Sequence, residues 1–226
     1  MAARIRRVTT TRAGGVSAPP FDTFNLGDHV GDDPAAVAAN RRRLAAAIGV
    51  DETRMVWMNQ VHGDRVELVE GPRETAVDDT DALVTTAPGL ALVVISADCV
   101  PVLMGDARAG VIGAAHAGRT GAAKGVVART LEVMLRAGAH VEDISVFLGP
   151  AVSGPNYEVP AAMADEVEAA LPGSRTVTAA GTPALDLRAG IVRQLRELGV
   201  SAVDVDPRCT VDAPALFSHR RDAPTG

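Results

Sequence analysis

Three side chains of the types that bind transition metals stand at turns or strand ends of the sequence. His62 precedes a glycine, Cys99 follows an aspartate, and His116 precedes an alanine and a glycine. One thiolate and two imidazoles form a three-ligand zinc set, which leaves the fourth tetrahedral position for water or substrate. The separations of 37 and 17 residues match no zinc finger. Because strand-end histidines are often purely structural, spacing alone leaves both interpretations open.

The chain contains only two cysteines. Cys99 and Cys209 are too few for a disulfide framework, although a single bridge between them is an alternative. The first eleven residues contain early arginines and no apolar h-region, so we expect no signal peptide. The longest apolar stretch, residues 90–95, is far too short to cross a bilayer. We therefore expect a cytoplasmic protein whose thiols stay reduced and free to bind metal.

Composition sets the size and class of the fold. The chain has 226 residues, 47% of them hydrophobic, and a formal net charge of −6. This suits one sizeable core, and we see no repeat or long linker, so we expect a single domain over residues 1–226. The densest basic run, residues 41–43, falls inside a predicted helix and is interpreted as a solvated face. A nucleic-acid partner is therefore not expected.

Strands that occur in runs must position the three candidate ligands. Apolar patterns predict strands at 5–10, 55–58, 65–70, 82–85, 90–96, 100–104, 111–115, 144–148 and 202–205. They predict helices at 34–48, 121–137, 160–171 and 187–198, the first starting with Asp33-Pro34 and the last capped by Asp186. The segment 90–96 is apolar almost throughout and is predicted to be buried on both faces. Because helices only sometimes separate the strands, we expect an α+β fold with a mixed sheet.

Several ordered strings extend the argument beyond spacing. Asn59–Gly63, Ser96–Pro101, His116–Gly118 and Phe217–Asp222 occur in this order, and five further strings accompany them: Thr9–Ser17, Asn25–Asp32, Asp81–Thr85, Gly149-Pro150 and Tyr157–Val159. Together they resemble the laccase-domain family, also called the multicopper polyphenol oxidase or purine nucleoside phosphorylase family. The resemblance runs from Thr9 through Gly226.

This resemblance implies a fold, a metal site and an activity. The implied fold has two mixed β-sheets packed between helices in four layers, α/β/β/α. The implied zinc ligands are His62, Cys99 and His116. The implied activities are phosphorolysis of purine nucleosides, including methylthioadenosine, and deamination of adenosine to inosine; an older attribution is copper-dependent phenol oxidation. The expected partners are a purine nucleoside and phosphate, with neither nucleic acid nor membrane, on a monomer or homodimer.

Two departures from the family pattern affect the substrate site. The family usually reads HAGWRG, whereas this chain has Arg119 at the tryptophan position and Thr120 at the arginine position. Arg119 could supply the missing charge from one place earlier. The chain also stops at Gly226, where the family usually continues with an arginine.

The sequence also suggests residues around the metal. Cys99 and His116 are predicted to be catalytic together with Asp98, which is the nearest candidate acid and has a turn-capping aspartate as its alternative. Arginines suit phosphate because their fork of donors binds two oxygens at once, and the predicted substrate contacts are Arg12, Arg119, Arg220 and, less so, Arg221. Asn25 and His29 are placed near substrate because they lie in a family-like string, and Tyr157 has either a substrate or a core role.

Three other function classes stay open. In a copper phenol oxidase, the electron relay needs many more histidine ligands than the five in this chain. In a cysteine hydrolase, Cys99 would be the nucleophile and His116 its base, and this chemistry also uses a thiolate. A metal-stabilised domain that binds a partner without catalysis is the third alternative.

Overall fold

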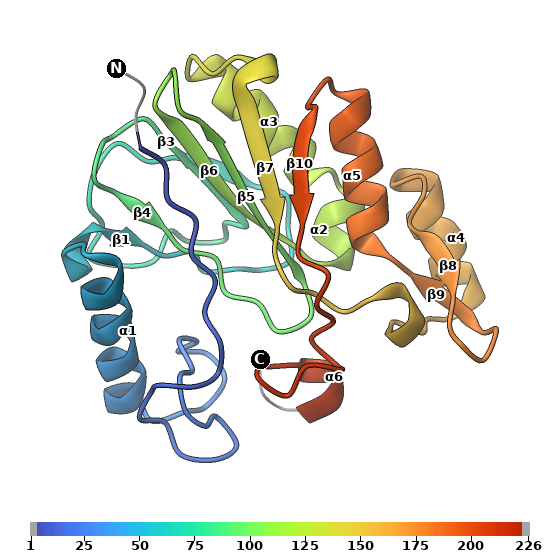
Figure 1. Ribbon diagram of the computed structural model, residues 1–226, viewed down its shortest axis with the longest axis horizontal. Helices are drawn as coiled ribbons and strands as arrows, with labels where there is room; N and C mark the ends of the chain where they lie inside the picture. The colour runs from blue at the N-terminus through green and yellow to red at the C-terminus, as the bar shows by residue number, and fades with distance from the viewer. Residues whose placement is uncertain (1–3, 223–226) are drawn as a thin grey trace.

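The computed structural model describes residues 4–222, and its centre is a six-stranded mixed sheet (Figure 1). The order across the sheet is β10 (Ala202–Val205), β7 (Ile144–Leu148), β5 (Val100–Asp106), β6 (Val111–Ala117), β3 (Ala82–Thr85) and β2 (Val66–Leu68). Neighbouring strands pair in parallel at β2–β3 and β7–β10 and antiparallel at the three central pairings. The predicted α+β fold with mixed sheets is confirmed.

Helices cover one face of this sheet and enclose the main core. They are α2 (Arg119–Ala123), α3 (Val126–Arg136) and α5 (Leu187–Glu197). Inward side chains of the sheet, such as Val84 and Met104, join Leu131 and Leu195 of the helices in one buried cluster. Beyond α5 lie α4 (Ala161–Ala170) and an antiparallel pair, β8 (Arg175–Val177) and β9 (Pro183–Leu185) (Figure 1). The helices therefore pack against one face of the sheet and fix the positions of its strands.

A smaller layer lies to the other side of the sheet. The parallel pair β1 (Met55–Val56) and β4 (Ala91–Leu92) packs with α1 (Pro34–Ile48) through Leu44 and Met55. Among the described residues, this pair is a parallel two-stranded sheet where the resemblance implied a second mixed sheet. The predicted limits of α1 are confirmed: the Asp33 side chain accepts from Ala35 N, and Gly49 ends the helix in the left-handed conformation.

The strand predicted at residues 5–10 is wrong, because this segment finds no ladder partner. Its backbone N–H and C=O groups make no hydrogen bond within residues 4–222, and strand structure requires such pairing. Side chains hold it in place: Arg7 donates to the Ser145 carbonyl at 2.7 Å, and Ile5 packs against the bare backbone of Gly105.

Two other predicted elements also differ, and three observed elements were not predicted. The segment 90–96 is a strand over Ala91–Leu92 alone, and residues 91–99 are half-buried, because only one edge pairs with β1 and a cavity borders the segment. The helix predicted at 121–137 is split into α2 and α3 by Gly125, whose φ of 87° no right-handed helix accommodates. The strands β8 and β9 and the short helix α6 (His219–Asp222) were not predicted.

The remaining elements are short or lie as predicted. The 3₁₀ turns are Glu52–Arg54, Val141–Asp143 and Gly154–Asn156. Asp186 caps α5 by accepting from Ala189 N at 3.1 Å, as expected from the sequence. Within residues 4–222, no helix has the length and apolar character that crossing a membrane requires.

Candidate metal centre

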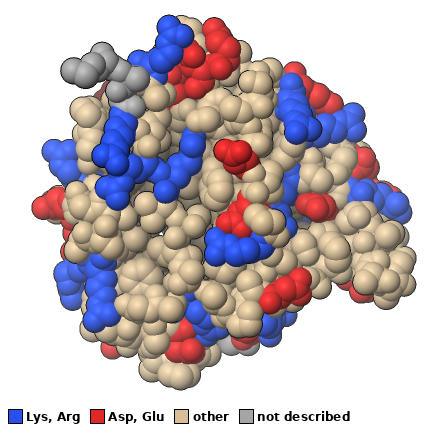
Figure 2. Space-filling model, in the orientation of Figure 1, with Lys and Arg blue, Asp and Glu red and all other residues tan. Residues whose placement is uncertain are grey.

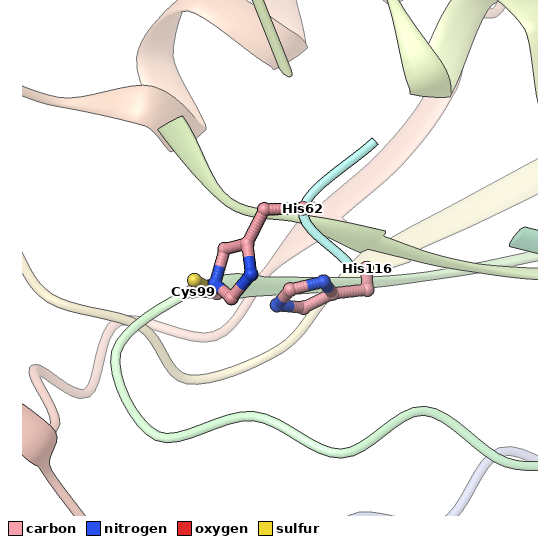
Figure 3. Close-up of side chains that lie close together, drawn as sticks. All are labelled: His62, Cys99 and His116. Carbon is pink, nitrogen blue, oxygen red and sulfur yellow. The ribbon is translucent and has the colours of Figure 1, made fainter. Parts of the chain in front are cut away.

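His62, Cys99 and His116 lie together at one end of the central strands (Figure 3). One ligand atom from each side chain lies within 4.8 Å of the other two. His116 is in β6 and faces Pro101 of β5, so Cys99 stands just before the paired strand, while His62 comes from the turn before β2. The imidazole rings of the two histidines meet edge to face, with centroids 4.8 Å apart and planes at 79°.

Glycine at position 118 makes this convergence possible. A Cβ built there would lie 2.8 Å from Cδ2 of His62 and 3.0 Å from Sγ of Cys99, closer than real side chains pack. At position 121 a Cβ would lie 2.5 Å from the carbonyl oxygen of Gly63 in the His62 turn. The His116-Ala117-Gly118 string therefore supplies both a ligand and the space for the other two.

One buried aspartate supports both histidines. The Asp81 carboxylate is fully buried and lies 2.8 Å from Nδ1 of His116. It also accepts backbone N–H bonds from Val61, His62 and Gly63 at 3.1, 3.0 and 2.7 Å. Asp81 lies in the Asp81–Thr85 string, which carries part of the family resemblance, but the sequence predicted no role for it. An acidic residue immediately before a fully buried strand was the available signal.

Mutual contacts shift the pKa values of the cluster. Burial alone would raise the pKa of Cys99, but hydrogen bonds and charge from His116 and His62 lower it to about 7. Burial alone would lower the pKa of His116, but Asp81 and Cys99 raise it to about 9. The pKa of His62 is also raised, chiefly by its hydrogen bond to Cys99. Between these values a thiolate lies beside an imidazolium, and a divalent cation could replace the proton of that pair.

The donor set fits a zinc ion better than a hard cation. A thiolate sulfur and imidazole nitrogens are borderline-soft ligands that suit zinc, whereas magnesium and calcium prefer oxygen. The three residues line a cavity of about 1050 Å³, so a ligand in that cavity could reach an ion held there. The residues present therefore fit a zinc ion with three protein ligands, the number found in catalytic zinc sites.

The Asp98 carboxylate is bonded to the C-terminal segment. Its carboxylate accepts from the Thr210 hydroxyl at 2.5 Å and from the backbone N–H of Arg220 at 2.7 Å. Its backbone has a φ of 95°, a left-handed conformation that the adjoining chain stabilises. These contacts favour the alternative interpretation over the predicted acid: Asp98 ties the Cys99 turn to the C-terminal segment.

Two of the predicted phosphate ligands are already engaged by the protein. The Arg12 guanidinium bonds Asp22 at 3.1 Å and Asp222 at 3.3 Å and lies over the Phe217 ring. Arg221 pairs with Asp222 and donates to four backbone carbonyls, those of residues 210, 211, 213 and 216. These partners favour structural roles for both arginines, as clamps on the C-terminal segment.

The two predicted substrate contacts in the loop, Asn25 and His29, differ in whether the protein already engages their side chains. Asn25 is buried, and its amide bonds Gly27 and Asp32, so it shapes its own loop. His29 is exposed and lines the cavity, with Asp28 3.9 Å away. Both residues line the cavity, but the Asn25 amide is already bonded within its own loop, which favours His29 as the ligand contact of this pair.

Tyr157 is flanked by the two arginines that remain. The Arg220 guanidinium lies 4.8 Å from the centre of the Tyr157 ring and donates to the Glu158 carbonyl. Burial and then the Cys99 charge raise the pKa of Tyr157, while Arg119 and Arg220 act to lower it. Both arginines and Tyr157 line the cavity. Among residues 4–222, neither Arg119 nor Arg220 forms an ion pair with a carboxylate; the ion pairs that are present involve other basic side chains.

Comparison with known proteins places this site in a family. Residues 6–226 match the family model described as multi-copper polyphenol oxidoreductase laccase. A purine nucleoside phosphorylase of Mycobacterium tuberculosis is 79% identical over 223 residues, covering 99% of this chain and 89% of that protein. A purine nucleoside phosphorylase of Corynebacterium glutamicum is 56% identical over 98% of this chain and 91% of that protein. This chain belongs to the laccase-like multicopper polyphenol oxidase family.

The structure agrees with that of another protein. The crystal structure of YlmD from Geobacillus stearothermophilus superposes with a TM-score of 0.89 at 38% identity, covering 96% of this chain and 86% of that one. The mixed sheet described above is therefore shared with YlmD, as the sequence resemblance implied.

The copper in the name of the laccase-like family is not matched by a large histidine set here. The cluster of three contains two histidines, and His140 lies at the opposite end of β5 and β6, beside Asp106 and Asp143. Relay among several copper ions uses more imidazoles than this arrangement brings together. The cluster thus suits one metal ion.

Proposed function

We propose that the chain is a zinc-dependent purine nucleoside phosphorylase that also deaminates adenosine. The observation that carries the proposal is a sulfur–nitrogen donor set in the wall of a large cavity, beside two arginines with no carboxylate partner among residues 4–222. The names of the similar proteins from Mycobacterium tuberculosis and Corynebacterium glutamicum support a nucleoside substrate. A family match across residues 6–226 supports one domain that carries the whole site.

Arg119 and Arg220 would bind the phosphate. Because neither is neutralised by a carboxylate, both guanidinium groups can donate to phosphate oxygens, and arginine forks do this in pairs. Arg119 stands at the N-terminal end of α2, close to the ligand His116. Arg119 would thus supply the cation that the family pattern places one residue later, where this chain has Thr120.

The aromatic side chain between the arginines would orient the nucleoside. Tyr157 presents a ring beside Arg220 and close enough to Cys99 for its charge to affect the tyrosine pKa. A planar base could therefore lie between this ring and the metal centre, with its ribose toward the arginines. When bound, zinc supplies Lewis-acid polarisation at the cavity wall.

Two reactions would share this site. In phosphorolysis, a phosphate oxygen bonds to C1′ of adenosine as the C1′–N9 bond breaks, giving adenine and ribose 1-phosphate. In deamination, water replaces the C6 amino group and ammonia leaves, giving inosine. Phosphate is consumed in the first reaction alone, so the arginines should affect the two reactions differently.

The test separates the products. Zinc-loaded protein is incubated with adenosine, with and without phosphate, and adenine, inosine and adenosine are resolved by chromatography. We expect adenine only with phosphate and inosine under both conditions. Arg220→Gln should raise the phosphate KM at least about 10-fold, because one charge-assisted hydrogen bond is lost. The proposal would be overturned if the zinc-loaded protein formed neither adenine nor inosine and instead oxidised phenols when loaded with copper.

A matched control guards against a general effect of removing charge. Arg193→Gln removes an arginine from α5 that pairs with Glu197 and does not line the cavity. We expect its phosphate KM and its inosine rate to equal those of the wild type. An equal rise in KM in both variants would contradict the assignment of Arg220.

A second candidate, a cysteine hydrolase, is favoured by the low pKa of Cys99 beside His116. A zinc ion and the acyl group of a covalent intermediate would compete for the same Cys99 sulfur. Removal of metal with a chelator separates the two: it should abolish nucleoside turnover, whereas a cysteine hydrolase would retain or gain activity.

A further inference from the structure

We propose that Asp81 is a positioning residue that prepares two of the three zinc ligands at once. The inference rests on the proposed metal site, but it is independent of which nucleoside reaction occurs there. It follows from the separate tasks of the two carboxylate oxygens. Oδ1 lies 2.8 Å from Nδ1 of His116 and accepts from the His62 N–H, while Oδ2 accepts from the N–H groups of Val61 and Gly63.

The bond to His116 selects a tautomer. A carboxylate accepts hydrogen bonds and donates none, so in a neutral imidazole the proton stays on Nδ1. That leaves the lone pair of Nε2 as the donor for metal. The backbone of Asp81 adds a second restraint, since its carbonyl accepts from the His116 N–H at 2.7 Å. The ring is therefore held both in place and in the state that can bind zinc.

The bonds to the turn hold the other histidine. His62 has a φ of 58°, a left-handed conformation that costs energy for a residue with a side chain. Three successive N–H groups point at the Asp81 carboxylate and satisfy the backbone of this turn. A Cβ at Gly63 would lie 3.3 Å from Oδ2, so the turn also fits closely around the carboxylate. Without Asp81, this geometry would lose its anchor.

Asparagine at position 81 cannot perform both tasks. If its NH₂ takes the place of Oδ1, it faces Nδ1–H of His116 and N–H of His62, and the imidazole must change tautomer. If the NH₂ takes the place of Oδ2, it faces the N–H groups of Val61 and Gly63, and the turn must open. Either orientation places donors against donors and disturbs one zinc ligand.

The experiment compares Asp81→Asn with Asp106→Asn in the full chain. Asp106 is also fully buried and accepts three backbone N–H bonds, from Arg108, Ala109 and His140, but at the opposite end of the strands. Zinc affinity is measured by competition with a chromogenic chelator on protein shown to be folded by circular dichroism. We expect Asp81→Asn to lose about 10–100-fold in zinc affinity and Asp106→Asn to match the wild type.

A second measurement needs no variant and remains decisive if Asp81→Asn does not fold. Long-range ¹⁵N–¹H correlation spectra of the zinc-loaded wild type report which His116 nitrogen carries the proton. We expect the proton on Nδ1. A proton on Nε2, equal zinc affinity in wild type and Asp81→Asn, or equal losses in both variants would each overturn the proposal. A wild type with no zinc affinity would overturn this inference and the metal proposal together.

Discussion

The two ends of strands β5 and β6 carry similar residues and yet differ in how well they are suited to bind a metal ion. One end holds His62, Cys99 and His116, and the other holds Asp106, His140 and Asp143, each group close enough to share an ion. A buried aspartate that accepts three backbone N–H bonds stands at each end, Asp81 at the first and Asp106 at the second.

The difference lies in which donor atoms are left free. At the second end, backbone N–H groups occupy Asp106, and Arg108 neutralises Asp143 at 3.1 Å. At the first end, Asp81 accepts from the backbone N–H groups and holds Nδ1 of His116, so the Cys99 sulfur and the two histidines contact one another in the wall of the cavity. A metal centre thus depends less on how many ligand-type residues gather than on a separate residue that satisfies the surrounding backbone.

The largest expected effect is the loss of the thiolate at the first end. Cys99→Ala should lower zinc affinity by more than about 100-fold, because removing a ligand costs more than removing its hydrogen-bond partner. Cys209→Ala is the control, since Cys209 is buried outside the cluster of three and its sulfur accepts from Ser153 N and Asn156 Nδ2. Metal analysis after dialysis reports both variants. Retention of zinc by Cys99→Ala would exclude the sulfur as a ligand.

The next effect concerns the thiol of the metal-free protein. The pKa of Cys99 is lowered to about 7 from 9.0, so its thiolate fraction at pH 7 should be about 50-fold larger than that of an unshifted thiol. Alkylation by iodoacetamide, followed by mass spectrometry, should therefore rise with pH around a midpoint near 7, and zinc should suppress it. A midpoint near 9 would contradict the pairing with His116.

A smaller effect is expected from closing the space around the ligands. In Gly118→Ala, the new methyl group would meet His62 and Cys99 at 2.8 and 3.0 Å, so both must shift. We expect zinc affinity to fall about 10-fold, within the range for residues that orient ligands. Gly71→Ala adds a methyl where nothing lies within 4 Å and should have no effect. Equal affinities in the two variants would show that the site is more adaptable than its packing indicates.

The smallest effect on zinc affinity is expected at the second end, where the substitution should change stability alone. Burial opposes ionisation of Asp106, but bonds from Ala109, His140 and Arg108 outweigh it and lower its pKa. A lowered folded-state pKa stabilises the protein above the unfolded value, and this contribution disappears as pH falls through the folded value. Asp106→Asn should lose about 1–3 kcal/mol of unfolding free energy at pH 7 and progressively less below pH 4.

Denaturant unfolding at several pH values measures this difference. The expected result is that the wild-type and Asp106→Asn curves converge under acidic conditions, because a protonated aspartate resembles asparagine. A difference that stays constant with pH would show that the charge of Asp106 contributes nothing to the folded state.

Local signals allowed parts of the fold to be predicted from sequence. Asp33, Pro34 and Gly49 specify the ends of α1 through capping and backbone preference, which need no tertiary contact. Residues 5–10 have a strand-like pattern, but a strand also requires a partner, and sequence periodicity says nothing about which neighbours arrive. Gly125 splits a continuous apolar pattern because its left-handed φ is decided by how α2 and α3 pack.

The candidate site shows the same limit. His62, Cys99 and His116 could be recognised because ligand chemistry is a property of the side chain itself. The role of Asp81 depends on partners 18 to 35 residues away, which no local pattern records. Arg12 could be identified as an arginine near a glycine turn, but Asp222, which neutralises it, is 210 residues away.

Charge of both signs is spread over the face of the molecule that Figure 2 shows. On that face (Figure 2), basic and acidic side chains are interspersed among a larger area of other residues, also near the centre of the view. A nucleic-acid partner calls for a continuous basic surface. The arginines that matter here line a cavity instead, beside the proposed metal.

X-ray absorption at the zinc edge tests the central claim most directly, because it distinguishes the two ends of the strands by their donor atoms. Zinc held by Cys99, His62 and His116 should show one sulfur near about 2.3 Å and nitrogens near about 2.0–2.1 Å. A shell of oxygen and nitrogen without sulfur, as Asp106, His140 and Asp143 would give, would contradict the account.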